Sequence, residues 1–215
     1  MTKRILRNTL PLLSLAAGLA VQVRGANIVS DGSFEIPTPS VETCYSGSLG
    51  DGWSATVGTI GIFTNALDSE GVPHSGNQYA YLDCFVTVNT LSQTLTTVPG
   101  QTYTFSFWLA DTNPNPVTVT FGGQTVFNGS APTNGTGSAS DYVNYTYAVT
   151  ATSTSTVITF TGQYTEGGTG TLLDDVSVTP TGLPTTPAPR SLYLCLIGLA
   201  GLALYTLTVR RRQVV

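Results

Sequence analysis

Apolar and polar residues alternate through the middle of the chain, with the period of two that is typical of β-strands with one buried face. The clearest case is Thr102–Ala110, where aromatic and aliphatic residues occupy every second position. Trp108 falls on the opposite side of that strand, together with Ser106. Similar patterns predict further strands at Gln78–Asp83, Leu91–Val98, Val143–Val149, Ser155–Thr161 and Leu172–Val178.

Glycine and proline mark the connections between these strands. Val117–Phe121 and Gln124–Phe127 flank a pair of glycines, which predicts a hairpin. Val98–Gln101 contains a Pro-Gly pair and predicts a turn. No part of residues 27–179 shows the 3.6-residue period of a helix. Many short strands joined by such turns indicate an all-β domain built as a β-sandwich over residues 27–179.

The N-terminus carries a different pattern. Lys3, Arg4 and Arg7 precede an uncharged apolar run at residues 10–21. A basic segment followed by a short apolar one predicts a secretory signal peptide, here residues 1–26. Small residues at several positions leave the cleavage site open, but the pattern predicts export.

The C-terminus carries a longer apolar run. Residues 191–209 contain no charge and, as a helix, would be roughly 28 Å long, close to the thickness of a bilayer core. We predict a single transmembrane helix here, the alternative being a buried core helix. The basic tail (210–215) begins with Arg210, Arg211 and Arg212, which would stay on the cytoplasmic side. The proline-rich residues 180–190 would link the sandwich to this helix.

The order of proline motif, apolar helix and terminal arginine cluster resembles the PEP-CTERM sorting tails of bacterial envelope proteins. The motif itself is Pro187-Ala188-Pro189, with Ala188 where that family has a glutamate. The resemblance implies that an exosortase-type sorting enzyme recognises and cuts the tail. The mature protein would then be released, transferred to another anchor, or left on its own helix.

Charge is distributed very unevenly. All twelve acidic residues lie between Asp31 and Asp175, and all eight basic residues lie outside that span. The predicted sandwich, residues 27–179, therefore has no lysine or arginine, which makes nucleic acid and anionic membranes poor partners. It also excludes mechanisms that need either side chain, such as Schiff bases and phosphate clamps. This acidic region would suit the binding of a hard cation such as calcium, which prefers oxygen ligands.

The three cysteines separate into two groups. Cys195 lies inside the apolar C-terminal run. Cys44 and Cys84 both lie in the exported region, where disulfides form, and neither has a second cysteine or a histidine at metal-ligand spacing. We predict a Cys44–Cys84 disulfide, the alternative being two free buried thiols.

Candidate catalytic groups are few. The single histidine, His74, is interpreted as a surface-loop residue, and no Gly-x-Ser-x-Gly motif presents a nucleophile. Asp174 and Asp175 are adjacent on a predicted strand, so they would point to opposite faces and not flank one bond. One of the two would then be partly buried without a Lys or Arg partner. The sequence therefore predicts that the protein is not an enzyme.

Six segments occur in the order seen in galactose-binding-like jelly rolls, and the chain resembles the DUF642 and CBM4/9-type carbohydrate-binding modules. The resemblance implies a jelly roll of about eight to ten strands. It also implies a structural calcium ion where the first and last strands meet, held by Glu35 with Asp174 or Asp175. The alternative is that backbone amides satisfy these carboxylates. The six segments are Asn27–Glu35, Gly52-Trp53, Ser75–Asp83, Leu91–Leu95, Pro99–Phe105 and Leu173–Val178.

Sugar recognition needs an exposed aromatic plane with amide and hydroxyl groups around it. Trp108 is the best candidate, with Ser106 beside it and Asn144 and Thr146 on the same outer face, unless Trp108 packs under a loop. Trp53 is interpreted as core. We therefore predict an exported, non-catalytic domain that binds extracellular polysaccharide at the cell envelope. The alternative is a structural or adhesive envelope protein that binds protein partners and has no sugar site.

Overall fold

The structure, a computed structural model, describes residues 25–36, 43–64, 71–84, 88–111, 115–131, 141–165 and 170–182. Nearly all of the predicted signal peptide and linker, and the whole of residues 191–215, lie outside these described residues. Among the described residues, no helix is long and apolar enough to span a membrane.

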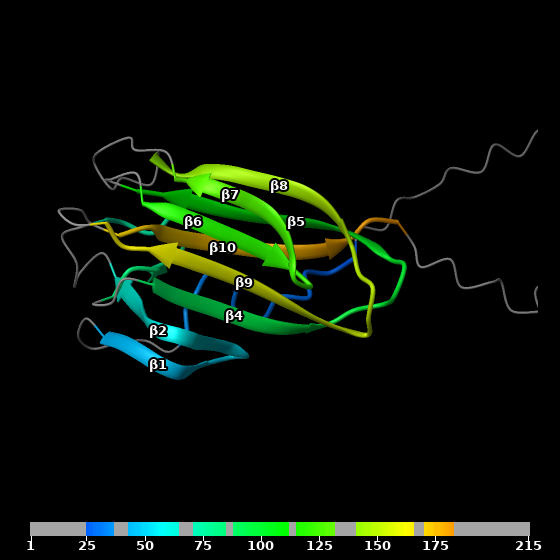
Figure 1. Ribbon diagram of the computed structural model, residues 1–215, viewed down its shortest axis with the longest axis horizontal. Coiled ribbons are helices and arrows are strands. Elements are labelled where there is room, and N and C mark those ends of the chain that lie inside the picture. Colours follow the sequence, from blue (N-terminus) through cyan, green and yellow to red (C-terminus); the bar gives the residue numbers. More distant parts are fainter. Residues whose placement is uncertain are drawn as a thin grey trace, which may run out of the picture.

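The described residues form ten antiparallel strands, whose arrangement is seen in Figure 1. They follow one another in hydrogen-bonded order β7-β6-β9-β4-β2-β3-β10-β5-β8, and β1 pairs with β2. The strands are β1 (Thr43–Gly50), β2 (Trp53–Thr64), β3 (Gln78–Tyr81), β4 (Val88–Thr96), β5 (Thr102–Ala110), β6 (Pro116–Phe121), β7 (Gln124–Ser130), β8 (Val143–Thr150), β9 (Ser155–Gln163) and β10 (Leu172–Pro180).

The long strand β2 joins two layers. Its first half pairs with β4, and its second half, from Gly61, pairs with β3. The pairing with β4 shifts register between Ala55 and Val57, and Gly58, whose φ of +64° is readily adopted by glycine, lies between the two halves. The two layers pack face to face: the ring centroid of Phe160 in β9 lies 5.3 Å from that of Phe107 in β5. The predicted all-β sandwich is confirmed, and the arrangement is consistent with a jelly roll.

The strands with strict alternation are confirmed, and β5 has the predicted bounds. Phe105 and Phe107 are fully buried, and Trp108 lies on the opposite face and is partly buried. The hairpin of β6 and β7 is also confirmed. Trp53 is a core residue, as expected, with its ring 5.2 Å from that of Phe34. The sequence did not predict β1 and β2, because serine and glycine interrupt the alternation in both.

The first described segment is attached to the last strand. The Asn27 side chain accepts a hydrogen bond from the Val178 amide (2.9 Å) and donates one to the Val176 carbonyl (3.3 Å). Ile28 N–H donates to the Val178 carbonyl at 2.9 Å. The first described residues are therefore held on β10, close to Asp174 and Asp175 along that strand.

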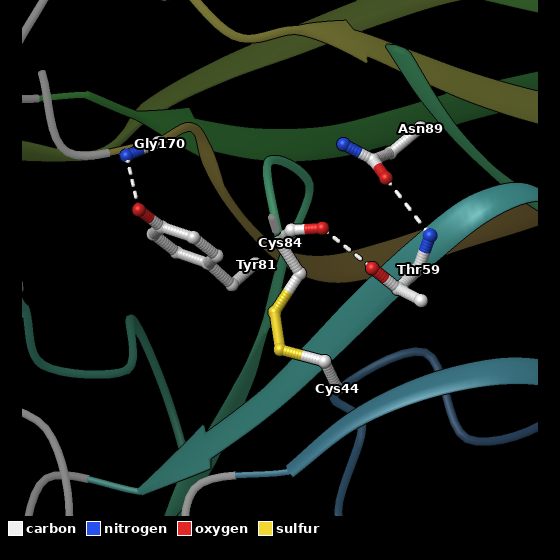
Figure 2. The surroundings of a disulfide bond; sticks show 6 residues. All are labelled: Cys44, Thr59, Tyr81, Cys84, Asn89 and Gly170. Atoms are coloured by element: carbon white, nitrogen blue, oxygen red, sulfur yellow. Dashed lines mark hydrogen bonds between the residues drawn. A yellow bond between two sulfur atoms is a disulfide. The ribbon is translucent and has the colours of Figure 1, made fainter. Parts of the chain in front are cut away.

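The predicted Cys44–Cys84 disulfide is present and connects β1 to the segment that follows β3 (Figure 2). Cys84 is 3% exposed. The Thr59 hydroxyl of β2 donates to the Cys84 carbonyl at 2.5 Å, and the Thr59 amide donates to the Asn89 side chain at 2.8 Å. The bridge is thus fixed to β2 as well.

Candidate functional site

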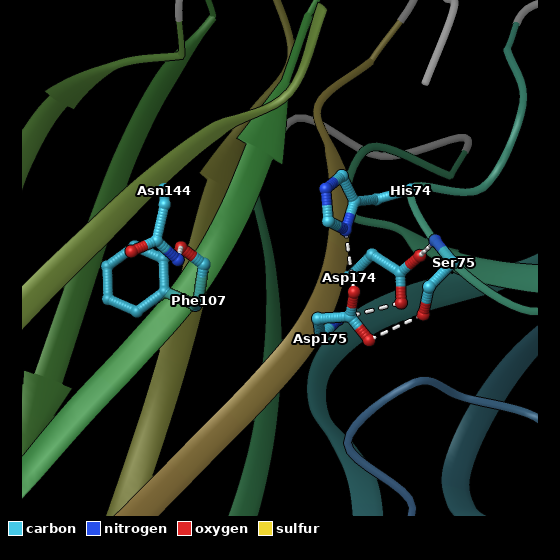
Figure 3. A network of polar contacts seen from close by, with 6 residues as sticks. All are labelled: His74, Ser75, Phe107, Asn144, Asp174 and Asp175. Atoms are coloured by element: carbon cyan, nitrogen blue, oxygen red, sulfur yellow. Dashed lines mark hydrogen bonds and ion pairs between the residues drawn. The ribbon is translucent and has the colours of Figure 1, made fainter. Parts of the chain in front are cut away.

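The candidate site centres on a β-bulge in β10. The pairing of β10 with β5 shifts register between Asp174 and Ser177, and Asp175 has a φ of +48°. Both carboxylates therefore reach Ser75: the Ser75 amide donates to Asp174 Oδ2 (3.0 Å) and its hydroxyl to Asp175 Oδ1 (2.7 Å) (Figure 3). The prediction that these two aspartates point to opposite faces is wrong, because the bulge breaks the alternation.

The bulge also changes which residues share a face. Leu173, Val176 and Val178 all belong to the main core, so the inward face moves from odd to even positions across the bulge. Asp174 shares the outer face with Leu172, whereas Val176 and Val178 face the main core. Asp174 is directly opposite Trp108 of β5 in the sheet.

Asp174 is fully buried, as one of the two aspartates was expected to be. Burial raises its pKa from 3.8 to about 7, and the Asp175 charge adds to the rise. The backbone amides of Ser75, Asp175 and His74 oppose it by hydrogen bonding to the carboxylate. The described residues include no lysine or arginine, so backbone amides provide the stabilising contacts of this buried acid.

His74 is not the surface-loop residue that the sequence suggested. Its Nδ1 lies 2.6 Å from Asp175 Oδ2, and its side chain is only 22% exposed. The imidazole stacks on Trp108 with ring centroids 3.8 Å apart and planes 20° apart, and its centroid lies 5.5 Å from that of Tyr142. The loop that carries His74 therefore covers one face of the Trp108 ring.

The four residues predicted for sugar binding lie together on the outer face of β5 and β8. Trp108 is paired with Asn144, and Ser106 with Thr146. Thr146 donates to the Asn144 side-chain oxygen at 2.7 Å. The Asn144 amide group, drawn beside Phe107 in Figure 3, donates to the Phe107 carbonyl at 3.5 Å. Asn144 and Thr146 are exposed, so their polar groups border Trp108 on the solvent side.

Glu35 holds the other end of the His74 loop. Its Oε1 accepts hydrogen bonds from the amides of Asn77 (2.7 Å) and Gln78 (3.1 Å). Among the described residues, no three His, Cys, Asp or Glu side chains converge as a metal site. Glu35 and Asp174 accept amide hydrogen bonds, and Asp175 contacts Ser75 and His74. Calcium binding stays a prediction.

Gly76 offers a direct test of this loop. Its φ is +64°, and a Cβ there would lie 2.1 Å from Glu35 Oε1. We expect Gly76→Ala to cost about 2–3 kcal/mol in urea unfolding, since the backbone is strained and Glu35 is displaced. Gly100→Ala is the control, because its φ is +80° with open space around it, and should cost about 1 kcal/mol. Equal costs would show that the Glu35 contacts do not matter.

Tyr142 also belongs to the site. It belongs to a small second core on the outer side of the sheet, against which Trp108 packs. Tyr142 is 5% exposed, and its hydroxyl has no hydrogen-bond partner among the described residues. Burial, followed by the charges of Asp174 and Asp175, raises its pKa. No periodicity marks Tyr142 or His74, because each reaches the site from outside the strands.

A second pair of buried carboxylates lies beside the start of β10. Thr171 bridges them: its amide donates to Asp83 and its hydroxyl to Asp111, both at 2.7 Å. Burial raises the pKa of Asp83 from 3.8 to about 6, and the Asp111 charge adds to the rise while the Thr171 hydrogen bonds oppose it. Asp83 and Asp111, like Asp174, are thus buried acids in a described region that includes no lysine or arginine.

No protein-family model matches the chain, and no curated protein matches it. Among solved structures, a Stig cyclase, Fisc, from Fischerella sp. TAU is 14% identical, with a TM-score of 0.53 over 75% of this chain and 99% of the cyclase chain. TmCBM61, in complex with β-1,4-galactotriose, is 15% identical with a TM-score of 0.46 (71% and 97% covered). The CBM22-1 xylan-binding domain from Paenibacillus barcinonensis Xyn10C is 16% identical with a TM-score of 0.44 (74% and 97%). The similarity to the cyclase shows a shared fold alone.

Proposed function

We propose that this chain is an exported cell-envelope protein whose sandwich binds extracellular polysaccharide without catalysing a reaction. The observation that carries the proposal is the Trp108 indole, held in place by the stacked His74 ring beside the amide of Asn144 and the hydroxyls of Ser106 and Thr146. The apolar face of a pyranose packs on an aromatic ring, and amide and hydroxyl groups bind its hydroxyls. A platform that is already fixed loses little entropy on binding.

A binding role fits the carboxylates better than catalysis does. Glycoside hydrolysis needs two carboxyl groups on either side of a glycosidic bond. Here Asp174 and Asp175 both bind Ser75, so they hold the loop together. Asp174 is moreover fully buried, out of reach of a polysaccharide chain.

Delivery to the envelope is supported by the two ends of the sequence. The signal peptide would export the chain, and the residue 191–209 helix would hold it in the membrane. An exosortase-type sorting enzyme would recognise Pro187-Ala188-Pro189 and release the domain or transfer it. These segments lie outside the described residues, so this part of the proposal rests on sequence.

One observation favours the alternative, a structural or adhesive protein that binds other proteins. The His74 loop covers one face of Trp108, which reduces the aromatic surface open to a sugar. The two functions differ in their binding partners, a polysaccharide in one and a protein in the other, so replacing Trp108 distinguishes them.

Trp108→Ala in the full-length protein, purified in detergent, is expected to weaken binding to glycans on an array by about thirtyfold. That loss is typical of a buried aromatic contact, about 2 kcal/mol. Circular dichroism checks the fold. Tyr164→Ala is the matched control, since Tyr164 is an exposed aromatic residue on another part of the domain and should not affect binding. A folded Trp108→Ala variant with unchanged glycan binding would refute the role of this residue and favour protein partners.

A further inference from the structure

The surroundings of Trp108 are acidic as well as aromatic. Asp174 lies opposite it in the sheet, and Asp175 is the next residue, with a side chain 27% exposed. The described residues include no lysine or arginine, and His74 is the one histidine among them. A ligand bound at this site therefore lies in a negative electrostatic potential, which no lysine or arginine of the described residues offsets.

The arrangement around His74 is that of a site for a cation. The imidazole lies over the Trp108 ring at 3.8 Å and near the Tyr142 ring at 5.5 Å, and its Nδ1 contacts the Asp175 carboxylate at 2.6 Å. Aromatic rings combined with a carboxylate are a common way for proteins to hold protonated amines. A basic ring of the chain itself thus already lies against Trp108, Tyr142 and Asp175. We call this group, together with His74, the aromatic-acidic cage.

Tyr142 provides a second, independent observation. Its hydroxyl is buried, has no hydrogen-bond partner among the described residues, and lies within the fields of both aspartates. A buried hydroxyl without a partner is costly, so a group that donates a hydrogen bond to it would be favoured. An ammonium group is such a donor, and it would also be attracted by Asp175.

We propose that the aromatic-acidic cage binds the protonated amine of an amino sugar. The inference rests on the proposed polysaccharide binding and specifies its ligand. The amine interacts with the exposed side of Asp175 and the aromatic rings, while the sugar ring packs beside Trp108 and contacts Asn144. N-acetylation removes the charge and weakens binding, and a uronic acid is repelled by Asp175.

Three oligosaccharides of equal length test the inference by calorimetry with the full-length protein. They are a glucosamine pentamer, its fully N-acetylated form and a galacturonic acid pentamer, measured at about pH 6, where sugar amines are protonated, and about 0.15 M salt. We expect the free-amine pentamer to bind at least about tenfold more tightly than the acetylated one, and the galacturonic acid pentamer to bind most weakly. Asp175→Asn should remove the preference for the free-amine pentamer. It should leave the affinity for the acetylated pentamer within about twofold of that of the natural protein.

Asp51→Asn is the matched control. Asp51 is exposed, has a φ of +42° like the +48° of Asp175, and its replacement removes the same charge. Asparagine tolerates this backbone conformation, so both variants should fold. If the acetylated pentamer binds as tightly as the free amine, or if Asp51→Asn lowers amine binding as much as Asp175→Asn, the inference is wrong and the proposed function stands. If no pentamer and no arrayed glycan binds, the proposed function fails as well.

Discussion

Raising the pH from about 4 to about 8 is expected to lower the free energy of unfolding of the sandwich by several kcal/mol. The reason is that Asp174 and Asp83 are buried, and burial raises the pKa of each, to about 7 and about 6 respectively. Many proteins instead gain stability over the lower part of this range, because their carboxylates are paired with cations. The described part of this domain has no lysine or arginine for such pairing.

The direction of the effect follows from proton binding. An aspartate with a raised pKa holds its proton more tightly in the folded than in the unfolded state, so its contribution to stability is fully present below pH 3.8. That contribution is lost as pH rises through the folded pKa, near 6 for Asp83 and near 7 for Asp174. At about 1.4 kcal/mol for each pH unit, Asp174 alone accounts for about 4 kcal/mol and Asp83 for about 3 kcal/mol.

Urea unfolding of the full-length protein at pH 4, 6 and 8 measures this effect. Asp174→Asn resembles the protonated acid in shape and stays uncharged, so it should remove more than half of the decrease and be at least as stable as the natural protein at pH 8. Asp51→Asn changes an exposed aspartate and should keep the full decrease. A stability that rises from pH 4 to 8 in the natural protein would show that these acids are not buried as described.

The sequence predicts much of the fold, because alternation has a direct physical cause. In β5, β6 and β9 one face packs on the other layer, so every second residue must be apolar, and the pattern is visible without knowing the partner strand. β1 and β2 lack this signal. β2 passes from one layer to the other around Gly58, so no single face of this strand stays buried along its whole length.

The candidate site is predicted less well, for two different reasons. The outer face that carries Trp108 and Asn144 follows from strand periodicity alone. The position of Asp175 does not follow from periodicity, since the bulge depends on a positive φ that aspartate tolerates but does not require. His74 is 34 positions from Trp108 along the chain, so their stacking is a tertiary contact that no local pattern contains.

Asp174 and Asp175 carry both a wrong prediction, about their faces, and a confirmed one, about burial. The sequence correctly indicated that one aspartate of the pair is buried without a Lys or Arg partner. It offered calcium or backbone amides as alternatives, and the structure provides amides from the His74 loop. That loop then covers Trp108, so the same contacts that satisfy the buried acid determine how much aromatic surface a ligand meets.

Loss of the Cys44–Cys84 disulfide is expected to cost about 4 kcal/mol of folding free energy. The bond closes a loop across a sequence separation of 40 residues, and the chain-entropy model gives about 4 kcal/mol for a loop of that length. The double variant Cys44→Ala, Cys84→Ala should therefore unfold at a markedly lower urea concentration. Cys195→Ala is the control, because Cys195 is not part of the bridge and its loss should leave the urea midpoint unchanged.

Adding a reductant distinguishes the effect of losing the disulfide bond on stability from the effect of replacing the two cysteine side chains. The natural protein should become about as unstable in reductant as the double variant is without it, whereas the double variant should not respond to reductant. In the described part of the chain β1 pairs only with β2, and the bridge attaches it covalently to the segment after β3. The β1 amides should therefore exchange hydrogen fastest once the bridge is removed. Two alkylatable thiols at these positions in the unreduced protein would contradict the bond, and a uniform rise in exchange would contradict a local role for it.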